Sequence, residues 1–156
     1  MTTITRSPLE EGYDFYITDK WNKEYHFKIL TFEIPPGMLS VAIETAEETE
    51  TYYPRKLEVL SDYNADIELA ELLLKAKIKK EINRKSLRLS SDNSFEIIGN
   101  TLRGEIIAEQ NISNLNEPVF AVDGRKISIQ QFCEMLAPYF SFRFKFEITD
   151  SSDEIF

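Results

Sequence analysis

The sequence predicts an α+β fold: a mostly antiparallel sheet of about seven or eight strands, one long helix and one shorter helix. Short segments in which apolar and polar residues alternate are separated by turn residues, which is typical of strands with one buried face. Residues 64–85 instead have apolar residues spaced by three and four, as in an amphipathic helix. No repeat or shift in composition marks a boundary, so residues 1–156 are interpreted as a single domain.

Four strands are expected in the N-terminal half, after a loose arm over residues 1–12. They are predicted over residues 13–18, 25–34, 38–46 and 55–60. The first two flank a polar turn that contains Trp21, and we expect them to form an antiparallel hairpin. For residues 38–46 the alternation favours a strand, whereas the alanine and glutamate content is also compatible with a short helix, and both alternatives stay open.

The long helix over residues 64–85 is expected to bury a stripe formed by Ile67, Ala70, Leu74, Ile78 and Ile82. Its acidic residues lie early and its basic residues late, which favours the helix macrodipole. Glu71 and Lys75 have the i,i+4 spacing of a helical ion pair in the favourable order. After this helix, short strands are expected over residues 87–89, 95–98 and 102–109, and the last two flank a tight turn over residues 99–101.

The most strongly patterned segment covers residues 118–150. Asp123-Gly124 predicts a type I′ hairpin turn, since both residues tolerate positive φ. Ser128 and Gln131 have the spacing of a capping box for a helix over residues 128–137, with Cys133 facing the core. The Phe ladder follows, which we define as the alternating apolar residues Phe140, Phe142, Phe144, Phe146 and Ile148. This pattern predicts a strand central to the core, followed by an acidic tail over residues 151–156.

Composition excludes several classes of function. A net charge of −9 argues against nucleic acid and anionic membranes as partners. The N-terminus has no apolar run like that of a signal peptide, and no segment is long and apolar enough to span a membrane, so we expect a cytoplasmic protein. A single cysteine excludes an internal disulfide and a cysteine-rich zinc site. The oligomeric state is left open.

The sequence contains no recognisable catalytic motif. One histidine, His26, excludes the usual histidine-based zinc sites, and neither a glycine-rich phosphate loop nor a G-x-S-x-G elbow is present. We therefore predict no cofactor and no metal ion, and we assign no catalytic residue. The 27 acidic residues keep a carboxylate enzyme with a divalent ion open as one alternative.

Two places are candidate binding surfaces. The first hairpin carries Trp21, Tyr25 and His26, where an exposed Trp would anchor a partner. The polar side of the Phe ladder carries Arg143 and Lys145. Residues 75–88 contain seven basic residues and one acidic residue, so whether this basic end of the long helix binds anything is a further question.

The C-terminal part resembles an uncharacterised family of bacterial domains. The matching residues are Gly104-Glu105-Ile106, the segment 118–128 with its Asp-Gly-Arg turn, Gln131-Phe132, Met135-Leu136, and 142–154. Members of that family often have Trp and Gly near the helix, where this chain has Ile129 and Cys133. The family has no assigned activity, so the resemblance implies a fold unit and no reaction.

The leading hypothesis is therefore a non-catalytic interaction or accessory domain with a protein partner. The alternative is an acidic inhibitor or immunity-type partner of a basic protein, since the chain is strongly acidic. The carboxylate enzyme is the third hypothesis.

Overall fold

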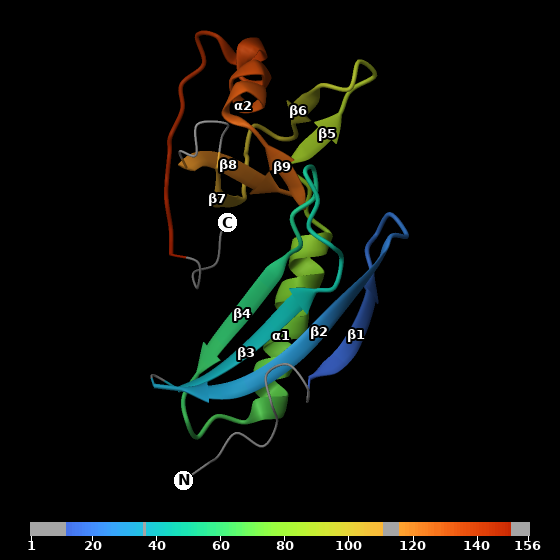
Figure 1. Cartoon of the computed structure of the whole chain (residues 1–156), viewed down its shortest axis with the longest axis vertical. Helices are drawn as coiled ribbons and strands as arrows, with labels where there is room; N and C mark the ends of the chain where they lie inside the picture. The colour runs from blue at the N-terminus through green and yellow to red at the C-terminus, as the bar shows by residue number, and fades with distance from the viewer. Residues whose placement is uncertain (1–11, 36, 111–115, 151–156) are drawn as a thin grey trace. The chain divides into compact units, whose positions relative to one another are not determined.

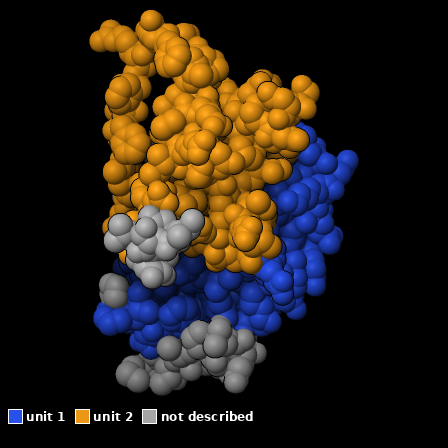
Figure 2. Space-filling view, turned by 45° about the horizontal axis from the view of Figure 1, so that its top comes forward, with its two compact units in different colours: residues 1–47, 54–84 blue, residues 48–53, 85–156 orange. Residues whose placement is uncertain are grey.

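The computed structural model describes residues 12–35, 37–110 and 116–150 (Figure 1). It divides into two compact units, residues 1–47 with 54–84 and residues 48–53 with 85–156 (Figure 2). The sequence was interpreted as one domain because nothing around residue 84 resembles a linker, yet each unit has its own hydrophobic cluster. The predicted acidic tail and nearly all of the predicted N-terminal arm lie outside the described residues.

The fold class is confirmed as α+β. The described residues contain nine strands in three antiparallel sheets and two α-helices, one strand more than the upper expectation. In the first unit the elements are β1 (Tyr13–Thr18), β2 (Glu24–Ile34), β3 (Gly37–Glu44), β4 (Lys56–Ser61) and α1 (Ile67–Ile82). The strands lie in sequential order, β1-β2-β3-β4, and α1 packs against one face of the sheet (Figure 1). Residues 38–44 therefore belong to a strand and not to a helix.

The core of the first unit forms between α1 and the sheet. Phe27 and Ile29 of β2 and Leu74 and Ile78 of α1 are fully buried there. Asp66 caps the helix, since its side chain accepts a hydrogen bond from the Glu68 amide. The predicted stripe is correct except at Ile67, which is exposed because it begins the helix.

Glu71 bonds to hydroxyls of the sheet, in addition to having the i,i+4 spacing from Lys75 that indicated an ion pair. Its carboxylate is buried and accepts hydrogen bonds from the hydroxyls of Thr31, at 2.5 Å, and Tyr13, at 3.0 Å. Thr31 in turn bonds to the Ser40 hydroxyl at 2.9 Å. Lys75 lies over the rings of Tyr13 and Phe15. The spacing of Glu71 and Lys75 indicated only an ion pair, because sequence alone does not show which hydroxyls of the sheet lie next to the helix.

The second unit contains short strands and one short helix. Its elements are β5 (Leu87–Leu89), β6 (Phe95–Ile97), β7 (Glu105–Gln110), β8 (Asn116–Val122), β9 (Arg125–Ile127), α2 (Ile129–Met135) and the 3₁₀ helix Ala137–Tyr139. β5 pairs with β6, and the other three strands form a sheet in the order β7-β8-β9. The predicted hairpin across residues 99–101 is wrong, because β6 pairs backward with β5 through the Ser90–Ser94 turn.

The Asp123-Gly124 turn joins β8 to β9 and has positive φ at both residues, 53° and 79°, as expected for type I′. The Asp123 carboxylate also accepts hydrogen bonds from the backbone amides of Ser86 and Leu87, at 2.8 and 2.9 Å. The turn residue therefore fixes the start of β5 as well. The capping box of α2 is present, with Ser128 and Gln131 bonding each other's backbone amides.

The core-facing side of α2 differs from the prediction. Met135 is buried and the Phe132 ring packs at a tilt against Phe120 of β8, with ring centroids 4.9 Å apart, whereas Cys133 is exposed. A helix of seven residues has only about two turns, so few of its side chains can contact the sheet. The apolar face that the spacing indicated is therefore only partly buried.

The largest correction concerns the Phe ladder. The predicted central strand does not form: within the described residues, 142–150 belong to no helix or strand. The segment runs in an extended form along the outside of the second unit (Figure 1). Its apolar side chains are exposed: Phe140 80%, Phe142 64%, Phe144 91%, Phe146 62% and Ile148 72%. The alternation indicates that this segment favours an extended backbone. A buried strand also needs a neighbouring strand with which it forms hydrogen bonds and side-chain contacts.

Candidate functional site

The structure separates the candidate residues of the first hairpin. Trp21 is 45% exposed in the turn between β1 and β2, and Lys20 lies 4.8 Å from its ring. Tyr25 is buried on the core face of β2, where its hydroxyl donates to the buried Asp19 at 3.2 Å. This burial raises the pKa of Tyr25. Since successive residues of a strand point to opposite faces, Tyr25 and His26 share no surface.

His26 belongs to a polar cluster on the opposite face of the same sheet. Its Nε2 lies 2.8 Å from Asp14 Oδ1 and its Nδ1 lies 2.9 Å from Thr45 Oγ1. The His26 ring also stacks on Tyr16, with centroids 4.3 Å apart. The hydrogen bond from His26 holds the pKa of Asp14 below its usual value.

The order carboxylate, imidazole, hydroxyl is that of a nucleophilic triad, but the surroundings indicate a structural role. Asp14 is half exposed, and the Thr45 hydroxyl also lies 3.3 Å from the backbone carbonyl of His26. A triad works in a site that excludes water and offers donors to an oxyanion. An exposed cluster whose hydroxyl bonds the neighbouring strand instead fastens β1, β2 and the end of β3 together.

A second charged cluster lies entirely within the second unit. Lys126 of β9 contacts Glu109 Oε1 at 2.5 Å and Glu48 Oε2 at 2.8 Å, and its side chain is only 7% exposed. These hydrogen bonds, with Glu109 first, raise the pKa of Lys126. An open crevice here is lined by Glu48, Thr49, Glu50, Glu109 and Lys126. Lys126 neutralises part of the acidic charge, and no group of three or more potential metal-ligating His, Cys, Asp or Glu residues occurs among the described residues.

Residues next to this crevice occupy one edge of the three-stranded sheet. Residues 51–53 run beside β9: the Lys126 amide donates to the Thr51 carbonyl, and the Tyr53 amide donates to the Gly124 carbonyl. Tyr52 and Arg125 form an antiparallel bridge. The outer edge of β9 is therefore occupied, while among the described residues β7 pairs only with β8.

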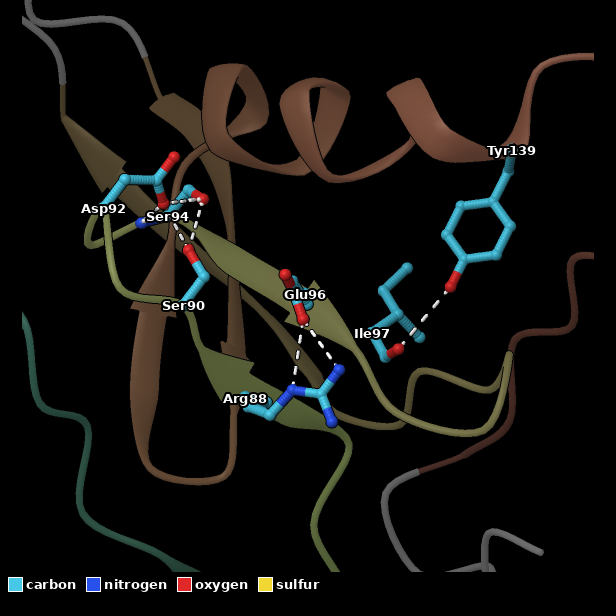
Figure 3. Close-up of polar contacts among 7 residues, drawn as sticks. All are labelled: Arg88, Ser90, Asp92, Ser94, Glu96, Ile97 and Tyr139. Atoms are coloured by element: carbon cyan, nitrogen blue, oxygen red, sulfur yellow. Dashed lines mark hydrogen bonds and ion pairs between the residues drawn. The ribbon is translucent and has the colours of Figure 1, made fainter.

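The β5–β6 hairpin is held by its own side chains, as Figure 3 shows. Asp92 accepts hydrogen bonds from the hydroxyls of Ser90 and Ser94 and from the Ser94 amide, which together lower its pKa to about 2. Arg88 bonds Glu96 through two nitrogens, at 2.7 and 3.1 Å. These contacts close the turn and tie its strands together.

Several basic residues between 75 and 88 already have partners inside their own unit. Lys77 donates to the Glu58 carbonyl of β4 at 3.0 Å, and Arg84 pairs with Glu81 at 3.1 Å. Lys75 lies over the rings of Tyr13 and Phe15, and Arg88 bonds Glu96. The number of basic residues in this segment therefore overstates its available positive charge.

Arg143 and Lys145 lie beside the Phe ladder, where sequence analysis placed them. Both are exposed, and Lys145 lies 3.8 Å from Glu147. What the sequence analysis missed is that the aromatic side of this segment is exposed too. Ile148 and the four Phe side chains form an apolar row that contacts little of the unit around it.

Comparison with known families divides the chain at nearly the same place as the two units. Residues 10–83 match the family model of a domain of unknown function, DUF7686. Residues 84–153 match a second, DUF7713. The chain is therefore similar to two uncharacterised domain families, one in each part of the sequence. The second match covers most of the C-terminal residues whose resemblance to an uncharacterised domain family was recognised from the sequence. No curated protein and no solved structure matches the chain.

Proposed function

We propose that this chain is a non-catalytic interaction module that binds a protein partner through the Phe ladder. The observation that carries the proposal is the exposure of five alternating large apolar side chains, from 62% to 91%. Exposed apolar groups of this extent usually mark a contact surface. Each Phe would gain about 1.5–3 kcal/mol on full burial, so covering even part of the row would favour association.

The form of the segment supports pairing with a sheet edge. The segment over residues 142–149 runs in an extended form (Figure 1) and alternates apolar with polar residues, which is the pattern of a strand with one buried face. An extended segment of this kind binds by adding a strand to an exposed sheet edge, where backbone hydrogen bonds supply affinity and side-chain contacts supply specificity.

We further propose where the protein is located and which partners it does not bind. No helix among the described residues is long and apolar enough to cross a bilayer. We place the protein in the cytoplasm, where a reducing environment suits the exposed thiol of Cys133. We expect no nucleic-acid partner, since the chain carries a net charge of −9.

Site-specific photo-crosslinking in the native host tests the proposal. Phe144 is replaced by p-benzoylphenylalanine, and Tyr16, an exposed aromatic residue of β1, receives the same replacement as a control. A discrete crosslinked protein product is expected from position 144 and not from position 16. It should disappear when Phe142 and Phe146 are changed to Ser in the same chain. Equal, diffuse crosslinking at both positions would contradict the proposed surface.

A second candidate function is an acidic partner of a basic protein, and the crevice beside Lys126 favours it. Glu48, Glu50 and Glu109 line this crevice together with a single cation. A basic side chain of a partner would bind there by charge. Such binding should weaken steeply as salt rises from 0.05 to about 0.5 M, because exposed charges are screened. Salt-independent binding of the crosslinked partner would reject this candidate.

A further inference from the structure

We infer that the partner of the Phe ladder is a second copy of this chain, whose β7 edge receives residues 142–149 as an added strand. This inference rests on the proposed function, because it names the partner of the same surface. Among the described residues, this extended segment pairs with no sheet, and the outer edge of β7 pairs with no further strand.

The open edge is β7. The sheet has the order β7-β8-β9, and residues 51–53 occupy the outer side of β9. Within the described residues, β7 pairs only with β8. Its outer amide and carbonyl groups therefore offer the hydrogen bonds that an extended segment needs.

The two faces of β7 differ in character, as the register shows. Glu105 lies opposite Ala121, which lies opposite Lys126, so Glu105 and Glu109 share the face of the sheet that carries this lysine. Ile106 and Ala108 alternate with them and lie on the face of Phe120, against which Phe132 of α2 packs. Ile106 is 51% exposed although its neighbour on β8 belongs to the core.

The Phe ladder segment has the complementary alternation. One side carries the apolar ladder and the other carries Arg143, Lys145, Glu147 and Thr149. If the segment is added beside β7 with the Phe side chains on the Ile106 face, its cations lie on the face of Glu105 and Glu109. The apolar ladder then lies beside Ile106 and Ala108, and Lys145 lies on the face of Glu109; apolar pairs and opposite-charge pairs across strands both stabilise sheets.

An antiparallel register with Lys145 opposite Glu109 matches the apolar face and this one charge pair. It sets Phe146 opposite Ala108, Ile148 opposite Ile106, Thr149 opposite Glu105, and Glu147 opposite Ile107. A shift by one residue would place Lys145 on the apolar face and the Phe side chains beside the glutamates. Only registers that differ by an even number of residues therefore keep each side chain on its matching face.

A second copy, and not the same chain, is the inferred donor. The segment leaves the 3₁₀ helix through a tight turn, in which the Phe142 amide donates to the Tyr139 carbonyl at 2.9 Å and Ser141 has a φ of 76°. The turn is fastened by the edge-on contact of the Tyr139 and Phe142 rings. From this turn the segment runs apart from the β7-β8-β9 sheet (Figure 1). Two copies that exchange segments complete both edges at once, as in a twofold symmetric dimer.

Disulfide trapping between two differently tagged copies tests the inference. Both copies carry Cys133→Ser. One carries Glu105→Cys and the other Thr149→Cys, which leaves the Phe ladder, Lys145 and Glu109 intact. Mild oxidation of the mixture is expected to give a heterodimer joined by one disulfide. A matched copy with Ile106→Cys, whose side chain points to the other face, should give roughly tenfold less product.

The other possible results of this experiment each contradict the inference in a different way. If a disulfide forms only when both cysteines are in one chain, the segment folds back on its own β7 and the second copy is rejected. If no disulfide forms in either arrangement while photo-crosslinking at position 144 yields a different protein, the proposed function stands and this inference falls. If neither experiment gives a product, the Phe ladder is not a contact surface.

Discussion

Asp92 illustrates how single carboxylates organise short segments of this protein. It accepts from two serine hydroxyls and one amide in the turn between β5 and β6, although it is fully exposed. These bonds favour the charged form and lower its pKa from the usual 3.8 to about 2. Since the folded pKa is lower than the unfolded one, the turn is stabilised above about pH 4. This contribution is lost as the pH falls through 2.

A pH titration of the Asp92 carboxyl carbon by NMR is therefore expected to show a midpoint near 2. In the Ser90→Ala, Ser94→Ala double variant the midpoint should move back toward about 4, because two donors to the carboxylate are removed. A midpoint near 4 in the unmodified protein would contradict the described turn.

Glu71 is the second carboxylate, and its burial makes it sensitive to its donors. Changing Thr31 to Val removes the hydroxyl that donates to Glu71 at 2.5 Å and leaves a nearly isosteric side chain. The first unit is expected to lose about 1–3 kcal/mol of unfolding free energy, because a buried acceptor loses a partner. Urea unfolding followed by Trp21 fluorescence measures the change.

Thr18→Val is the matched control, since Thr18 is exposed at the end of β1. It should change the unfolding free energy by less than about 0.5 kcal/mol. An equal cost at positions 18 and 31 would mean that the buried hydrogen bond contributes nothing.

At the scale of elements, local sequence signals predicted much of the structure. The spacing of Leu74, Ile78 and Ile82 located α1, and Ser128 with Gln131 located the start of α2. These signals are properties of neighbouring residues, so they act before any tertiary contact forms. The β5–β6 pairing was not predicted. Turn residues lie on both sides of residues 95–97, and the sequence alone does not show which of the two turns forms the hairpin.

Asp123 joins two elements, and its substitution separates the two roles. Asp123→Asn tolerates the positive φ of the turn and keeps one neutral acceptor, so we expect a cost of about 1 kcal/mol. Asp123→Ala loses both acceptor oxygens and favours the turn less, so we expect about 2–3 kcal/mol. Chemical denaturation followed by NMR signals of the second unit measures both values. Equal, negligible costs would show that the bonds to Ser86 and Leu87 do not hold β5.

At the scale of the whole molecule, the chain has two compact units, each with a hydrophobic cluster of its own and each similar to a different domain of unknown function. The sequence did not reveal this division, because apolar segments are spread evenly along the chain. It also did not reveal the candidate site. The Phe ladder has the pattern of a core strand, and only the structure shows that it pairs with no strand among the described residues and is exposed.

Amide hydrogen exchange over residues 143–149, measured across a range of protein concentrations, tests the central claim most directly. At low concentration these amides should exchange at nearly unprotected rates. As the second copy binds, protection should rise together with that of β7, and Phe144→Ser should abolish both increases. Unprotected exchange of the segment at every concentration, with β7 unchanged, would contradict the assignment of the Phe ladder as a strand that completes another copy's sheet.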